Sequence, residues 1–200
     1  LHNRCRRQRQ MCIRDRGFLT PNGLLGAADR AQAWLYQRLV NDALSATIYP
    51  AYLAGLGYSI DVADSGFAIS VSGYQDKQMA LLDTVAEKLL NAEISTDRFI
   101  TIKASLIKDW RNSRKDKPYV QALGALNDTL LSASWSADTL ADALEPITVE
   151  GLLQWRFDQF QDVGVIAALH GNVTASEAEQ LHKFINETIN PRASSANARE

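Results

Sequence analysis

The chain has 200 residues, of which 46% are hydrophobic and 22% are charged, and its formal net charge is −2. These values are typical of one soluble globular domain of ordinary size. No apolar stretch approaches the roughly 20 residues that a membrane-spanning helix needs. The composition therefore excludes a membrane-spanning protein, and the hydrophobic content excludes a largely disordered one.

The first 16 residues differ in composition from the rest of the chain. They carry six arginines and one acidic residue, Asp15, and they hold both cysteines, Cys5 and Cys12. Residues 17–200 contain 15 basic and 22 acidic residues, which gives a net charge of −7, and no cysteine. The near-neutral total therefore hides an acidic, cysteine-free body.

Three interpretations of residues 1–16 compete. A basic arm would contact nucleic-acid phosphates, and a targeting peptide would need an apolar core that this segment lacks. The third interpretation is a non-native segment, because the run MCIRDR is encoded by DNA that resembles a transposon end used in sequencing-library preparation. We favour the third, and we predict a non-native or disordered leader over 1–28, a domain over 29–190 and a flexible tail over 191–200.

The spacing of apolar residues predicts the elements of the first half of the chain. Apolar positions at helical spacing predict a helix over 31–46, and Pro50 is expected to close that region. Two alternating runs around Asp64-Ser65-Gly66 predict a β-hairpin over 56–74 with one buried face. Helical spacing then returns and predicts helices over 77–91 and 96–115.

The second half of the chain is predicted to be mostly helical. Pro118 fits the first turn of a helix that runs to about residue 132, and shorter helices are predicted over 137–144 and 148–160. An apolar run predicts a buried strand over 163–171. The pattern from Thr174 to Glu177 is a capping box, which predicts a helix from there to about residue 189.

This order predicts an α+β fold, mainly helical, with a small, mostly antiparallel sheet covered by helices. The tryptophans are expected to lie mostly in the core, although a helix that exposes one is suited to dock against a neighbouring domain.

The sequence predicts no catalytic, cofactor-binding or metal-binding residue. His182 has Glu179 three residues earlier on the same predicted helix, but a solvated surface pair explains that spacing better than half of a metal site. His170 ends the predicted strand and is expected to be structural. The cluster Arg111–Lys117 lies in an acidic body, so we interpret it as a helix end and partner contact, and we predict no nucleic-acid site.

Several runs in the body resemble one protein family. They are LYQRLVNDAL, YPAYLAGLGYSI, GFAISVSGYQDKQ, the segment from DRFITIKASLIKDWRN to KDKPYVQALG, and ALHGNVT. Together they resemble the third domain of the pitrilysin/insulysin (insulinase-like) zinc metallopeptidases, in order and spacing from about Asp29 to Ile189. The runs SGYQDKQ (72–78) and LHGN (169–172) are the most specific.

The resemblance implies a domain that shares the metallopeptidase fold without its metal site. In this family the motif H-x-x-E-H lies in the first domain, and the zinc of the parent enzyme belongs there. The predicted helix over 31–44, where the counterpart of that motif would fall, contains neither His nor Glu. The resemblance therefore implies no cofactor and no catalytic residue in this chain.

The resulting hypothesis is a fragment of a pitrilysin-like zinc metalloendopeptidase that degrades peptides. The fragment would be a non-catalytic module of the chamber wall, inactive alone, whose partners are the other domains of the same peptidase; the parent would bind peptide substrates. The alternative is a standalone binding module or inactive partner subunit with the same fold. The compartment is left open by the sequence, and it would be the periplasm if the parent is a bacterial pitrilysin.

Overall fold

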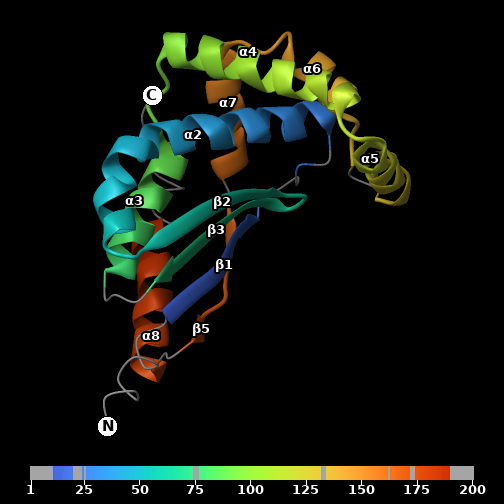
Figure 1. Ribbon diagram of the computed structural model, residues 1–200. Helices are drawn as coiled ribbons and strands as arrows, with labels where there is room; N and C mark the ends of the chain where they lie inside the picture. Colours follow the sequence, from blue (N-terminus) through green and yellow to red (C-terminus); the bar gives the residue numbers. More distant parts are fainter. Residues whose placement is uncertain are drawn as a thin grey trace.

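The computed structural model describes residues 11–19, 24, 26–73, 77–131, 134–161, 163–171 and 174–189. Its elements lie in the following order along the chain (Figure 1): β1 (Met11–Leu19), α2 (Ala27–Leu53), β2 (Gly57–Ala63), β3 (Gly66–Gly73), α3 (Gln78–Asn91), α4 (Thr96–Asn112), α5 (Pro118–Leu130), α6 (Ala137–Leu144), α7 (Val149–Phe160), β4 (Gly164–Ala167), β5 (His170–Gly171) and α8 (Ala175–Phe184). A short 3₁₀ turn (Ser113–Lys115) follows α4, and a π-helical turn (Ile185–Ile189) follows α8. The predicted α+β class, mainly helical with a small antiparallel sheet, is confirmed.

The sheet has the strand order β2-β3-β1-β4, and β5 pairs with β1 beyond the end of β4. All of the pairings are antiparallel, with Ile60 opposite Ile69 in the hairpin and Phe18 opposite Phe67 across β1 and β3. Nine residues of the expected leader thus form the strand between β3 and β4. Whether that segment is native stays a prediction, as do the proposed boundaries of the domain.

The hairpin buries one face, as its alternation predicts. Ile60 of β2 and Phe67, Ile69 and Val71 of β3 are at most 2% exposed, and these side chains share one side of the sheet. Figure 1 shows α2 crossing over the sheet, with α3 beside it and α4 on the far side of α2. The apolar stripe Leu82, Val85 and Leu89 of α3 is completely buried.

The connection from β3 to α3 explains part of the run SGYQDKQ. Gly73 has φ 151°, and a Cβ at this position would lie 2.7 Å from Leu56 Cδ2 and 2.8 Å from the Gly55 carbonyl oxygen, so only glycine fits. The amide of Gln78, which is 1% exposed, donates a hydrogen bond to the Gly73 carbonyl at 2.8 Å. These two residues therefore fix the start of α3 against the end of the hairpin.

The expectation that Pro50 closes the first helix is wrong. The helix α2 begins at Ala27 and continues through Pro50 to Leu53. A proline removes one N–H donor, and here the loss falls in the exposed last turn, where the carbonyl of Pro50 still accepts from the Ala54 N–H at 3.1 Å. The sequence pattern therefore underestimated the helix by about one turn at its start and about two turns at its end.

The expectation of one buried strand over 163–171 is also wrong. The segment forms two short strands, β4 and β5, and Ile166 is 60% exposed. Because β4 pairs only with β1 among the described strands, it lies at the edge of the sheet, where an apolar side chain is left uncovered. The predicted capping box is confirmed, with the Glu177 N–H donating to Thr174 Oγ1 and the Thr174 N–H donating to Glu177 Oε2.

Replacing Phe67 by alanine tests the core beneath α2. The ring is 1% exposed and lies between the rings of Tyr36, Trp155 and Phe160. We expect the free energy of unfolding to fall by about 3–5 kcal/mol, because a cavity replaces a fully packed ring. Urea unfolding measures the loss. The matched control Tyr49→Ala, at a ring that is 63% exposed, should change stability by less than about 0.5 kcal/mol, and an equal loss in both variants would contradict the assignment.

Candidate functional site

The helix α2 occupies the position where the resemblance places the counterpart of a catalytic helix. Its sheet-facing side is apolar, with Ala31, Leu35, Tyr36 and Val40 all at 0% exposure. These side chains pack into the main core, so this face contains no space for a ligand and no group that would bind one. The sheet-facing side of α2 is therefore occupied by buried side chains of the core.

Tyr36 lies at the centre of that face. Its ring centroid is 6.1 Å from that of Phe67, 6.3 Å from that of Trp155 and 6.2 Å from that of Phe160, and its hydroxyl donates to the Leu89 carbonyl of α3. Burial raises the pKa of the Tyr36 hydroxyl to about 12. A tyrosine in this state is protonated at neutral pH, and its hydroxyl is a structural donor that joins α2 to α3.

The two histidines considered in the sequence lie apart from this face. His182 is exposed on α8, and its Nε2 lies 3.0 Å from the Asn186 amide nitrogen; Glu179 is also exposed on the same helix. His170 belongs to β5, opposite Cys12 of β1. The two histidines therefore lie on different elements, His182 on α8 and His170 on β5.

The described residues of this chain do not fit the zinc that the resemblance implies for the parent enzyme. Within the described ranges, no three His, Cys, Asp or Glu side chains come together as metal ligands would, whereas a catalytic zinc needs three protein ligands. Across the same residues, no helix combines the length and the apolar character needed to cross a bilayer.

A shallow, open groove runs between α2 and α4, where Gln37, Arg38, Asn41 and Asp42 of α2 face Ile102 and Ser105 of α4. Several of its polar groups are engaged within the chain: Gln37 donates to the Ile60 carbonyl at 2.9 Å and Tyr58 donates to Asn41 at 3.0 Å. Asp42, the carboxylate that lines the groove, accepts from Arg98 of α4.

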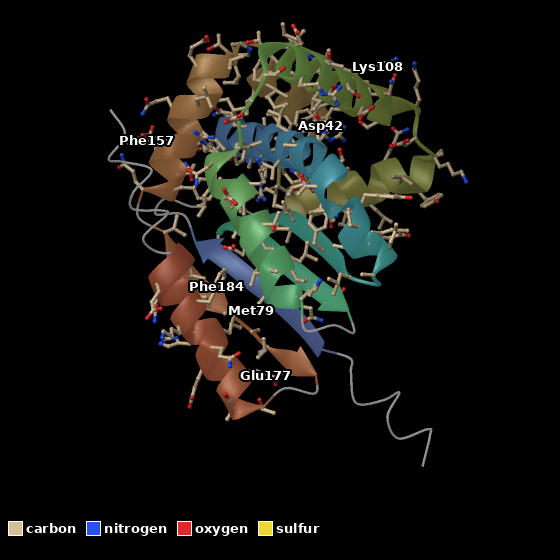
Figure 2. All side chains as sticks on the ribbon, turned by 90° about the vertical axis from the view of Figure 1, so that its left-hand side faces the viewer. Asp42, Met79, Lys108, Phe157, Glu177 and Phe184 are labelled. Carbon is tan, nitrogen blue, oxygen red and sulfur yellow. The ribbon has the colours of Figure 1, made fainter. Side chains whose placement is uncertain are left out.

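Two ion pairs join α2 to α4 along this groove. Arg98 of α4 donates from Nε to Asp42 at 2.8 Å, and Arg38 of α2 donates to Asp109 at 2.8 Å. Figure 2 shows Asp42 beneath α4, whose upper surface carries Lys108. The hydrogen bond from Arg98 lowers the pKa of the Asp42 carboxyl below its usual value of 3.8. The groove is therefore a polar seam between two helices.

The basic cluster Arg111–Lys117 is partly used inside the chain. Arg111 binds three carboxylates of α6 and its end: Asp138 at 3.4 Å, Asp142, and Glu145 at 3.0 Å. Arg114 also binds Asp138, at 2.9 Å from its Nε. Sequence reasoning missed this cluster. The spacing of 138, 142 and 145 places three acids on one face of a helix, but it does not indicate that Arg111 lies against that face.

Lys103 binds the backbone at the C-terminal end of α6. Its ammonium donates to the carbonyls of Glu145 at 2.8 Å and Ile147 at 2.7 Å, which are acceptors left open where that helix ends. Partial burial lowers the pKa of Lys103, and the Glu145 carboxylate opposes that shift. Together with Arg111, this contact fixes α6 on α4.

The arrangement of helices and sheet matches a solved structure. The chain superposes on the crystal structure of pitrilysin with a TM-score of 0.82 at 18% identity, covering 90% of this chain and 19% of that one. At this identity the match establishes a shared fold. The chain thus has the fold of the matching part of pitrilysin, and its described residues assemble no cluster of metal ligands.

The sequence comparisons establish the family. Residues 18–143 match the family model described as the middle or third domain of peptidase M16, and the chain belongs to that family. It is 31% identical over 172 residues to the insulin-degrading enzyme of Homo sapiens, covering 86% of this chain and 17% of that enzyme. A Schizosaccharomyces pombe protein whose name includes the words zinc protease is 26% identical over 175 residues, which covers 88% of this chain and 18% of that protein. The chain therefore spans less than a fifth of the length of these relatives.

Replacing Asp138 by asparagine tests the ion pairs between α4 and α6. Hydrogen bonds from Arg114, and secondarily from Arg111, lower the pKa of the Asp138 carboxyl below its usual 3.8. A lowered carboxyl pKa stabilises the fold above the unfolded-state value, and this contribution is lost as the pH falls through the folded-state pKa. We therefore expect stability to fall as the pH drops below about 4, the ordinary pKa of an aspartate, and Asp138→Asn to flatten part of that slope.

Urea unfolding at a series of pH values measures this effect. The matched control is Glu93→Gln, at an exposed carboxylate in the loop between α3 and α4, which should retain the slope of the unaltered chain. An unaltered slope in Asp138→Asn would show that the cluster does not stabilise the fold.

Proposed function

We propose that this chain is the third, non-catalytic domain of a pitrilysin-like zinc metalloendopeptidase that degrades peptides. The observation that carries the proposal is the apolar face of α2, which packs where a catalytic helix would present its ligands. A domain of this family with that face filled has a structural role. It would form part of the wall of a peptide chamber and pack against other domains of the same polypeptide.

The proposed contribution to catalysis is physical. A rigid wall excludes water from a bound peptide and restricts its orientation, and both effects accelerate a reaction carried out elsewhere. The seam between α2 and α4 and the bonds that fix α6 support such rigidity, because they join three helices through Arg38, Arg98 and Arg111. These residues would hold the wall in shape and touch no substrate atom.

Zinc and substrate enter this proposal through the relatives. The name of the S. pombe relative refers to a zinc protease, and that of the human relative refers to insulin degradation. We infer that the zinc of the parent enzyme is held by its first domain and that the substrates are peptides. Both inferences concern a longer polypeptide in which this chain is one part.

The DNA on both sides of this reading frame tests the proposal directly. We expect a continuous frame that encodes H-x-x-E-H upstream of the codon for Asp29. A true start codon close to that position would instead favour a standalone inactive subunit with the same fold.

Peptidase assays give the second test. The purified 200-residue chain should bind no stoichiometric zinc and should cleave no peptide in an EDTA-sensitive way, whereas the polypeptide encoded by the longer frame should do both. In that polypeptide, replacing the glutamate of H-x-x-E-H by glutamine should abolish cleavage. EDTA-sensitive cleavage by the 200-residue chain alone would overturn the proposal.

A further inference from the structure

The helix α5 (Pro118–Leu130) is apolar, yet none of its residues is buried. Its large apolar side chains are among the most exposed in the described part of the chain: Tyr119 at 62%, Val120 at 41%, Leu123 at 57%, Leu126 at 50% and Leu130 at 70%, with Leu131 at 59% just beyond the helix. Figure 1 shows α5 at the edge of the molecule, beyond the ends of α4 and α6 and away from α3 and α8. The helix therefore presents a continuous apolar surface outside the core.

Four of these side chains form one stripe. Tyr119, Leu123, Leu126 and Leu130 follow each other at steps of four, three and four residues, so they lie on the same face of the helix. We call this set the α5 stripe. The spacing is that of a helix face that packs against a partner.

The opposite face of α5 is held by its own chain. Gln121 donates from its amide to the carbonyls of Arg114 at 3.1 Å and Asp116 at 2.7 Å, and Asp128 accepts from the Ser134 hydroxyl at 2.7 Å. At 100° per residue, Gln121 and Asp128 lie roughly opposite the α5 stripe. Hydrogen bonds thus join the polar face to the segments that precede and follow the helix. The apolar face remains exposed to solvent.

The composition of α5 argues against a membrane as the covering surface. Helices that lie in a membrane interface carry lysines and arginines along their polar face. The helix α5 contains no lysine or arginine, and its one charged residue is Asp128. A protein surface suits this helix better than an anionic lipid surface.

The lengths of the relatives indicate which protein surface covers the α5 stripe. More than four fifths of the human insulin-degrading enzyme lies outside the part that this chain matches. The α5 stripe lies within residues 18–143, the part that matches the middle or third domain of the family. A domain with this position in a long polypeptide has other domains beside it in the same chain, at a high effective concentration.

We propose that the α5 stripe is the contact surface for a neighbouring domain of the same peptidase, which covers it with an apolar face. This inference rests on the proposed function, since it requires the longer polypeptide. The stripe would then be buried in the parent enzyme and exposed only when this chain stands alone.

Hydrogen exchange measured by mass spectrometry tests the inference on the 200-residue chain and on the polypeptide encoded by the longer frame. Backbone amides of residues 118–131 should exchange at least tenfold more slowly in the longer polypeptide. The variant Leu123→Glu/Leu126→Glu should remove that protection there. The matched control Ala125→Glu, which adds a carboxylate on the other side of the same helix, should retain it.

The variants are also made in the 200-residue chain, where urea unfolding should be unchanged because the stripe is exposed. If the double glutamate variant of the longer polypeptide fails to fold, Leu123→Ala/Leu126→Ala replaces it, with the same loss of protection expected to a smaller degree.

Three results would overturn the inference. Equal exchange of residues 118–131 in both polypeptides would show that no domain covers the stripe, as would protection that survives the stripe variants. Protection in the 200-residue chain alone, with a doubled mass by light scattering, would identify a second copy as the occupant. Peptide cleavage is measured separately, so that the two proposals can fail independently. A longer polypeptide that cleaves peptides without protecting α5 refutes only this inference. A longer polypeptide that protects α5 without cleaving peptides refutes only the proposed function.

Discussion

The structure depends on the position of α2, which is packed between the sheet and α4. On the sheet side, burial dominates, since Leu35, Tyr36 and Val40 are withdrawn from water and Tyr36 packs against three other aromatic rings. On the α4 side, Phe99 and Leu106 of α4 are buried in the same core, and the pairs Arg38–Asp109 and Arg98–Asp42 lie along the rim. Exposed ion pairs contribute little free energy each, so burial stabilises both contacts of α2 and the ion pairs add charge complementarity between α2 and α4.

Contacts far apart in the sequence complete this arrangement. The indole N–H of Trp155 in α7 donates to Asp29 in the first turn of α2 at 3.0 Å, and Arg156 donates to the Ala92 carbonyl after α3 at 2.8 Å. The helix α7 thereby binds the beginning of α2 and the end of α3 through two adjacent residues. This face of α2 is therefore the place where α2, α3, α7 and the sheet meet.

The sequence was informative wherever a local rule decides the structure. Periodicity predicted α3 and the hairpin closely, and the capping box placed the start of α8 at Thr174, because these features depend on residues within a few positions. The sequence predictions were wrong at Pro50 and over 163–171. Whether the helix continues through Pro50 depends on the exposure of its last turn, and whether the strand is buried depends on which strand lies next to it in the sheet. The charge cluster around Arg111 was partly visible, yet its partners at 138–145 are brought to it by tertiary packing, which spacing along one segment does not encode.

The place of β1 in the middle of the sheet has a consequence for how the chain folds. The hairpin of β2 and β3 joins neighbouring residues and closes a short loop, whereas Arg16 of β1 pairs with Ala167 of β4, near the other end of the chain. Contacts at such sequence separation form slowly, because the entropy of closing a long loop must be lost first. During synthesis, the hairpin and α2 can associate early, but one edge of β1 stays open until residue 167 has emerged. Until then that edge is available to any other strand. The pairing of β4 with β1 is therefore the folding step most exposed to misassociation.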